Sequence, residues 1–150
     1  MACQGLGEDY HLISENEWLT VAESILRAGE NFTEDELNDI GEYILTNGNI
    51  IYDLTGAIGE WTDRIITRAE LMLPVSDAWL EYYEVGDYKG FDIAPPYYLT
   101  DEDNNIGRIL TGDNGSSRRG FVRGNSGLYS LDLSRSPAEA SEDIGFRCAR

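Results

Sequence analysis

The sequence predicts a small α+β domain, in which a helix comes early in the chain and short strands come late. Three observations lead to this prediction: an amphipathic repeat near the N-terminus, an Asn-Gly dipeptide between two β-rich runs, and an alternating apolar segment near the C-terminus. At 150 residues the chain has the length of one domain, so we expect a single domain over residues 1–150. We expect two or three helices, short strands and long irregular loops.

The N-terminal helix is predicted over residues 14–28. Ser14 and Glu17 have the spacing of a capping box, in which two side chains satisfy backbone amides at a helix start. From Trp18 to Ile25, apolar side chains recur at i, i+3, i+4 and i+7, which places them in one stripe on a helix. The segment therefore predicts an amphipathic helix that packs one face on the core.

The middle of the chain predicts a hairpin between two short helices. A Thr-x-x-Glu capping signal opens a short helix over residues 33–40. Two β-rich runs within Glu42–Asp53 flank Asn47-Gly48, so we expect a hairpin with a type I′ turn. Residues 54–63 are interrupted by glycine and are predicted as a loop that leads into a short strand. Residues 76–84 are predicted as a helix capped by a serine.

The C-terminal half is predicted to be loop-rich until its last quarter. Regular periodicity is scarce over residues 86–127, where we expect anchored loops. Residues 128–133 alternate apolar and polar side chains, which predicts a half-buried strand with its polar face in solvent. A polar loop over residues 134–143 and a last strand over residues 144–148 complete the expected order.

Composition excludes several classes of function. The chain carries 11 Lys+Arg and 28 Asp+Glu, so its formal net charge is −17, and we expect no nucleic-acid partner because phosphates would be repelled. No apolar run approaches the length of a membrane-spanning helix, so we expect no membrane insertion. The chain has one histidine, no C-x-x-C pair, and no nucleophile-elbow, P-loop or dinucleotide-binding motif.

Four segments together resemble the formylglycine-generating-enzyme (sulfatase-modifying factor) family. Residues 10–18, Tyr-His-Leu-Ile-Ser-Glu-Asn-Glu-Trp, are similar to the segment that begins the first helix of that family. Residues 54–63 resemble its G-N-V-W-E-W segment, and residues 122–131 resemble a shortened form of its R-G-G-S-W region. Residues 145–148 match its closing G-F-R-C. The resemblance implies a C-type-lectin-type fold whose two ends lie together.

The resemblance also implies a role for the two cysteines. In that family a Cys before the first helix pairs with the Cys of G-F-R-C, and Cys3 and Cys148 stand at the matching places. Two buried free thiols in an intracellular protein are the alternative. The reactive Cys pair of the enzymes, and the His cluster of related iron-dependent sulfoxide synthases, have no counterpart in this sequence. We therefore expect no catalytic residues and no enzymatic activity.

A closer resemblance is to the variable proteins of diversity-generating retroelements, in which an error-prone reverse transcriptase diversifies the C-terminal part of a lectin-type domain. Residues 123–148 would be the variable region, because a framework of apolar residues and glycine alternates there with polar positions. An ordinary half-exposed strand would alternate in the same way. The positions expected to face a ligand are Arg123, Asn125, Ser126, Tyr129, Ser130, Asp132, Ser134, Arg135, Ser136, Glu139, Ser141, Glu142 and Asp143.

The function implied by this resemblance is recognition of a macromolecular ligand, either a surface protein or a glycan. Within the set of ligand-facing positions, Arg123, Tyr129 and Arg135 are best suited to act as anchors. The resemblance also implies a surface-exposed, virion-associated or extracellular location. The alternatives are a divergent oxidase of the formylglycine-generating type and a calcium-dependent carbohydrate-binding lectin.

No cofactor is expected, and calcium is the one metal for which the sequence offers any candidate ligands. Asp101, Asp103 and Asn105 have the 1-3-5 spacing of a hard-cation loop, but the glycine and the glutamate of an EF-hand are missing. Glu60 stands in the segment that often holds calcium in the resembled family. A solvated acidic turn is the favoured interpretation of the first three residues.

Overall fold

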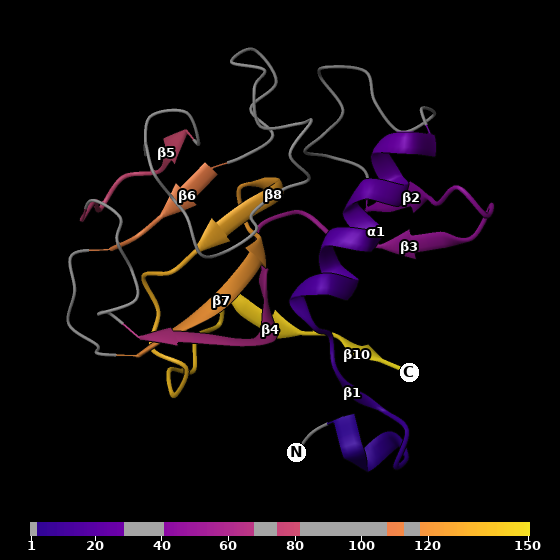
Figure 1. Ribbon diagram of the computed structural model, residues 1–150, viewed down its shortest axis with the longest axis horizontal. Helices are drawn as coiled ribbons and strands as arrows, with labels where there is room; N and C mark the ends of the chain where they lie inside the picture. The colour runs from indigo at the N-terminus through magenta and orange to yellow at the C-terminus, as the bar shows by residue number, and fades with distance from the viewer. Residues whose placement is uncertain (1–2, 29–40, 68–74, 82–107, 113–117) are drawn as a thin grey trace.

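The computed structural model describes residues 3–28, 41–67, 75–81, 108–112 and 118–150. These residues form a small mixed α+β domain with one α-helix and several strands (Figure 1). The elements are η1 (Cys3–Leu6), β1 (His11–Leu12), α1 (Glu15–Ala28), β2 (Glu42–Ile44), β3 (Ile50–Tyr52), β4 (Gly59–Thr67), β5 (Leu80–Glu81), β6 (Arg108–Leu110), β7 (Arg118–Gly124), β8 (Gly127–Asp132), β9 (Ile144–Phe146) and β10 (Cys148–Ala149).

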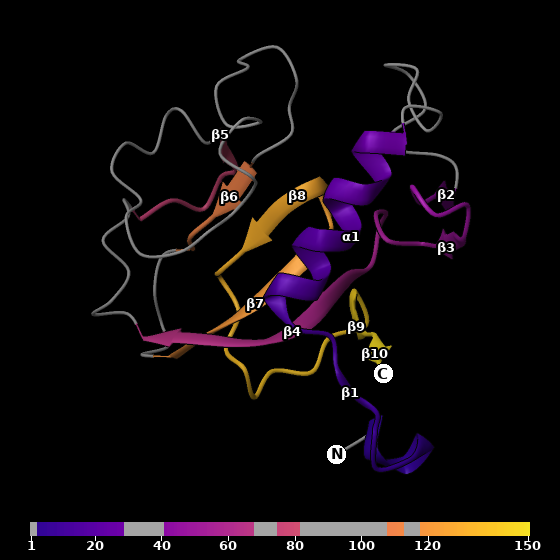
Figure 2. The same cartoon turned by 45° about the vertical axis from the view of Figure 1, so that its right-hand side comes forward.

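The largest sheet contains six strands in the order β5-β6-β8-β7-β4-β9. Strand β7 pairs antiparallel with both β4 and β8, whereas the β6–β8 and β4–β9 pairs are parallel. Two separate two-stranded pairs, β1–β10 and β2–β3, complete the described architecture. Because β1 pairs with β10, the N-terminal and C-terminal segments lie side by side, as Figures 1 and 2 both show.

Helix α1 begins directly after Ser14, and the predicted capping box is confirmed. The Glu17 amide donates to the Ser14 hydroxyl at 3.3 Å, while the Ser14 amide donates to the Glu17 carboxylate at 2.8 Å. Trp18, Ala22 and Ile25 are completely buried, and they share a core cluster with side chains of β2 and β8. The apolar stripe seen in the sequence is thus the face by which α1 covers the sheet.

The predicted hairpin is confirmed as β2 and β3, but its turn differs from the expected type. The Leu45 amide donates to the Asn49 carbonyl at 2.8 Å, so the loop contains three residues. Gly48 has φ 82°, and Asn47 is not among the described residues with positive φ. The expectation of a type I′ turn is therefore wrong, because a three-residue loop needs only one left-handed residue, which Gly48 supplies.

The helix predicted over residues 76–84 is wrong for its described part, residues 76–81. Ser76 forms an isolated bridge with Gly112, and β5 pairs with β6. The Ser76 hydroxyl accepts a hydrogen bond from the Ala78 amide and donates one to the Ala78 carbonyl, so it closes a local turn. The Ser76 side chain does bond to the backbone, as a capping residue would, but it stabilises a turn that leads into β5 at the edge of the sheet.

Two further expectations concern segments that lie partly or wholly outside the described residues. Residues 86–127 were expected to be loops, yet they contain β6 and the central strand β7. That expectation is wrong for both strands, because β7 is buried on both faces and so lacks the polar–apolar alternation that marks a half-exposed strand. The helix predicted over residues 33–40 lies outside the described residues.

Gly124 shows how tightly helix, loop and sheet meet, and it supports a first testable prediction. Its φ is 85°, and a Cβ atom at this position would lie 2.4 Å from the Leu54 carbonyl oxygen and 3.1 Å from the Trp18 ring. We expect Gly124→Ala to lower the free energy of unfolding by about 3 kcal/mol, since left-handed strain and overpacking add. Urea denaturation measures the change.

Gly48→Ala is the matched control for this prediction. Gly48 has a nearly equal φ of 82°, but a Cβ there would meet no atom within 4 Å. The free energy of unfolding should therefore fall only because of backbone strain in this control, by about 1–2 kcal/mol. Equal losses for the two variants would contradict the close contact proposed for Gly124.

Candidate functional site

The residues expected to face a ligand divide into a buried group and an exposed group. Arg123, Tyr129, Ser130 and Asp132 are buried, with at most 1% of each residue exposed. Their assignment to a ligand-facing surface is therefore wrong. Both faces of β8 are covered, so the alternation in residues 128–133 does not separate an inner face from a solvent face.

Arg123 links the sheet to α1 through a buried ion pair. Its guanidinium donates to both oxygens of the Glu15 carboxylate, at 3.2 and 3.1 Å from Nε, and Nη2 donates to the same carboxylate. The guanidinium also donates to the carbonyls of Tyr129 and Ser130. Thr62 on β4 donates its hydroxyl to Glu15 at 2.7 Å, so three elements meet at one carboxylate. Arg123 therefore has a structural role.

The buried polar side chains of β8 hold the turns at the two ends of that strand. The Ser130 hydroxyl accepts a hydrogen bond from the Ser126 amide at 3.1 Å. The Asp132 carboxylate accepts from the Ser134 amide at 2.7 Å and from the Ser134 hydroxyl. Because these groups bond to the backbone, burial does not leave them unsatisfied. These polar side chains therefore stabilise the turns at the two ends of β8.

The remaining predicted positions lie in or next to the loop over residues 134–143, and all of them are half-buried or exposed. They are Asn125, Ser126, Ser134, Arg135, Ser136, Glu139, Ser141, Glu142 and Asp143. The structure therefore removes the four buried positions from the predicted surface and leaves the others accessible to solvent.

Both ends of this loop are fixed to the sheet. The buried Arg119 guanidinium donates to the Ser134 carbonyl at 2.7 Å, and the Gly120 amide donates to the Arg135 carbonyl at 3.1 Å. At the other end, the Gly59 amide donates to the Asp143 carbonyl at 2.9 Å. Backbone atoms of the loop make these contacts, so they do not depend on which side chains the loop carries at the exposed positions.

Arg135 is engaged within the loop. Its guanidinium lies 2.8 Å from the Glu139 carboxylate, 3.0 Å from that of Asp143 and 3.7 Å from that of Asp132. Three acidic partners surround one cation, so the side chain ties the middle of the loop to its two ends. An anchor role for Arg135 toward a ligand would require these contacts to be exchanged.

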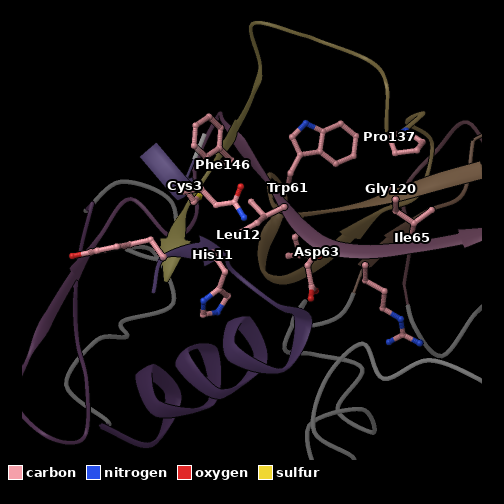
Figure 3. A pocket seen from close by; sticks show the side chains of 13 residues that line it. Cys3, His11, Leu12, Trp61, Asp63, Ile65, Gly120, Pro137 and Phe146 are labelled. Carbon is pink, nitrogen blue, oxygen red and sulfur yellow. The ribbon is translucent and has the colours of Figure 1, made fainter. Parts of the chain in front are cut away.

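A pocket of about 740 Å³ lies beside this loop, along β4. The N-terminal segment and Phe146 line one end, residues of β4 line the middle, and Gly120 and Pro137 line the other end. Figure 3 shows Cys3 and Phe146 at one end, Pro137 and Gly120 at the other, and Trp61 between them. The lining residues are Cys3, Gln4, Tyr10, His11, Leu12, Trp61, Thr62, Asp63, Arg64, Ile65, Gly120, Pro137 and Phe146.

The sequence did not reveal this pocket, because its residues come from three distant parts of the chain. The one local signal was an aromatic residue in the segment over residues 54–63: Trp61 is only partly buried. A Cβ atom on Gly120 would lie 2.2 Å from the Trp61 ring, so the indole rests directly on the backbone of β7. That contact joins two residues that are far apart in the sequence.

Glu60, a candidate metal ligand, forms an ion pair with Arg147. Arg147 donates to its two carboxylate oxygens at 2.9 and 2.7 Å. Burial raises the pKa of Glu60 above its ordinary value, while the Arg147 guanidinium acts in the opposite direction. The Arg147 guanidinium also donates to the carbonyls of Tyr52 and Asp53. Glu60 therefore fixes Arg147, which lies between β9 and β10, to β4, and a calcium ion at Glu60 would have to displace the Arg147 guanidinium.

The other candidate metal ligands, Asp101, Asp103 and Asn105, lie outside the described residues. Within the part of the chain that the structure describes, no three His, Cys, Asp or Glu side chains are grouped so that they could hold a metal ion. In that same part, no helix is long and apolar enough to cross a membrane.

Cys3 and Cys148 form a disulfide, as the family resemblance implied. Cys3 is buried and lines the pocket, and its partner lies on β10 beside β1. The bridge therefore fixes the N-terminal side of the pocket to the end of the chain.

Comparisons of the chain with protein-family models, with curated proteins and with solved structures find no match.

Proposed function

We propose that this chain is a non-enzymatic ligand-recognition domain on a C-type-lectin-type scaffold, and that the loop over residues 134–143 is its recognition surface. The observation that carries the proposal is the construction of this loop, which is fixed to the sheet at both ends by backbone hydrogen bonds and is exposed between them. A loop of this kind can exchange its exposed side chains at a small cost in stability, because its backbone carbonyls make the hydrogen bonds that fix it to the sheet.

The diversification suggested by the sequence is part of the same proposal. In a variable protein of a diversity-generating retroelement, framework positions stay constant while surface positions change. The separation between buried residues of β7 and β8 and exposed residues of the loop supports this arrangement. The proposed variable positions are those of the loop over residues 134–143, together with Asn125 and Ser126 in the turn between β7 and β8.

The pairing of β1 with β10 and the bridge between Cys3 and Cys148 support the proposed scaffold, because they bring the ends of the domain together. A structural disulfide also favours an oxidising compartment, in keeping with an extracellular or virion-associated protein. The proposed ligand is a macromolecule on another surface. An oxidase of the formylglycine-generating type would need a thiolate, and both cysteines of this chain are in the bridge.

Sequencing the gene and its neighbourhood tests this proposal. We expect a second copy of the codons for residues 123–148, a reverse-transcriptase gene nearby, and differences between the copies at template adenines. The differences should fall at Ser136, Glu139, Ser141, Glu142 and Asp143, which are half-buried or exposed. They should spare the buried Arg123, Tyr129 and Leu131, where substitution would disturb the core. A single copy, or differences spread equally over both groups, would refute the diversification.

A further inference from the structure

The pocket along β4 exposes apolar side chains beside the proposed recognition loop. Ile65 is 45% exposed and Phe146 is 54% exposed, and both line it together with Trp61, Leu12 and Pro137. Pro137 belongs to the loop as well, so loop and pocket form one continuous surface. Exposed apolar side chains grouped around a hollow are typical of interaction sites.

The shape of the pocket is set by the backbone and by the disulfide. Trp61 rests on Gly120, where any larger residue would meet the indole ring. The N-terminal wall is held by the bridge between Cys3 and Cys148 and by the pairing of Leu12 with Cys148. The pocket therefore exists before a ligand arrives, which lowers the entropy lost on binding.

The lining of the pocket holds Asp63 together with Arg64 and His11, and acidic side chains outnumber basic ones in the N-terminal segment and in the loop that border it. Asp63 lines the pocket and is exposed, and its Oδ1 accepts a hydrogen bond from the Glu15 amide at 3.3 Å. In the sequence, the exposed Glu8 and Asp9 directly precede the lining residue Tyr10. The exposed Glu139 and Glu142 follow the lining residue Pro137, and Glu139 pairs with Arg135.

Three basic side chains lie near the same pocket, and each has a neighbour that engages it. His11 contacts the Glu17 carboxylate at 3.0 Å. The Arg64 guanidinium lies 4.9 Å from the centre of the Phe121 ring, and that of Arg150 lies 5.7 Å from the Tyr10 ring. The contacts of Arg64 and Arg150 with aromatic rings leave both guanidinium groups charged. The attraction for a positively charged partner comes instead from the acidic excess of the whole chain, whose formal net charge is −17.

We infer that this pocket binds a basic peptide segment of a protein partner, one apolar side chain of which inserts between Trp61 and Phe146. The apolar lining fits a hydrocarbon or aromatic side chain, and the acidic residues around it fit lysine or arginine on either side of that anchor. The inference rests on the proposed function only in treating the chain as a recognition domain. It adds a contact area and a class of partner that the loop alone does not specify.

Titration of the ¹⁵N-labelled, disulfide-bonded protein with three peptide probes tests this inference by NMR. The probes are acetyl-Lys-Phe-Lys-amide, acetyl-Glu-Phe-Glu-amide and acetyl-Lys-Ala-Lys-amide. We expect the first probe to shift the Trp61 indole N–H and the Gly120 amide in a saturable manner. The second probe lacks the complementary charge and the third lacks the anchor, so each should bind about tenfold more weakly or worse.

A pair of surface variants tests whether the binding belongs to the pocket. Ile65→Lys places a cation in the lining and should weaken binding of the first probe by about tenfold. Ile50→Lys is the matched control, because Ile50 is 49% exposed on β3 and does not line the pocket. It should leave binding unchanged. Thermal melting of both variants confirms that each is folded.

Asp63→Asn tests the charge separately from the fold. Asparagine keeps the Oδ1 acceptor for the Glu15 amide, so α1 retains that contact. In this variant, the affinities for the Lys-Phe-Lys and Glu-Phe-Glu probes should differ by less than they do in the native protein.

Equal binding of the Lys-Phe-Lys and Lys-Ala-Lys probes, equal binding of the two Phe probes, or full binding by Ile65→Lys would overturn the inference. Diversified loop codons together with a pocket that binds none of the probes would leave the proposed function standing while this inference fails.

Discussion

Replacing Arg123 with methionine is expected to lower the free energy of unfolding by about 3–5 kcal/mol, because it leaves the Glu15 carboxylate buried without its cation. Arg123 is completely buried, and 6% of the Glu15 side chain is exposed. The carbonyls of Tyr129 and Ser130 would lose a donor at the same time. Urea denaturation of the disulfide-bonded protein measures the change. A loss below about 1 kcal/mol would contradict the structural role that we assign to Arg123.

The double variant Glu15→Gln with Arg123→Met separates the contribution of the ion pair to stability from the contribution of side-chain packing. Glutamine still offers an oxygen to the Thr62 hydroxyl and carries no charge. We expect the double variant to be more stable than Arg123→Met alone, since no buried charge is left unpaired. Additive losses in the cycle would mean that the two side chains do not interact strongly.

Reduction of the bridge between Cys3 and Cys148 is expected to lower the stability by up to about 5 kcal/mol in the loop-entropy account, because the two residues are 145 positions apart. The unfolded chain would gain the freedom that the bridge removes. The midpoint of urea unfolding, measured with and without dithiothreitol, gives the difference.

The control for this second prediction is the variant in which both cysteines are alanine. It should unfold at the same urea concentration with and without reductant, close to the midpoint of the reduced native chain. A native protein whose midpoint does not respond to reductant would show that the β1–β10 pairing alone holds the ends together.

The elements that the sequence predicted correctly are those whose signals are local. The capping box of Ser14 and Glu17 is formed by residues three positions apart, and the stripe from Trp18 to Ile25 lies on one helix. The β2–β3 hairpin was marked by Gly48, although its turn has three residues. In each case neighbouring residues supply both partners of the interaction, so the pattern can be read along the chain.

The predictions that failed concern positions where distant segments decide the outcome. Ser76 looks like a helix cap, but its segment pairs with β6, more than 25 residues away. Ser130 and Asp132 alternate with leucines, yet both faces of β8 are covered. Hydrogen bonds to neighbouring turns make their burial possible, and nothing in a two-residue alternation reports such bonds.

By itself, the sequence determined the α+β class, the helix with its cap and the hairpin, whereas the expectation that Cys3 and Cys148 meet came from the family resemblance. Only the tertiary structure decided which polar residues of the last quarter face outward. It removed Arg123 and the buried residues of β8 from the candidate surface and left the positions in the loop over residues 134–143. It also assembled the pocket from the N-terminal segment, β4, Gly120, Pro137 and Phe146. The physical reason is that burial depends on what packs against a strand from elsewhere in the chain, while periodicity records only which side chains share a face.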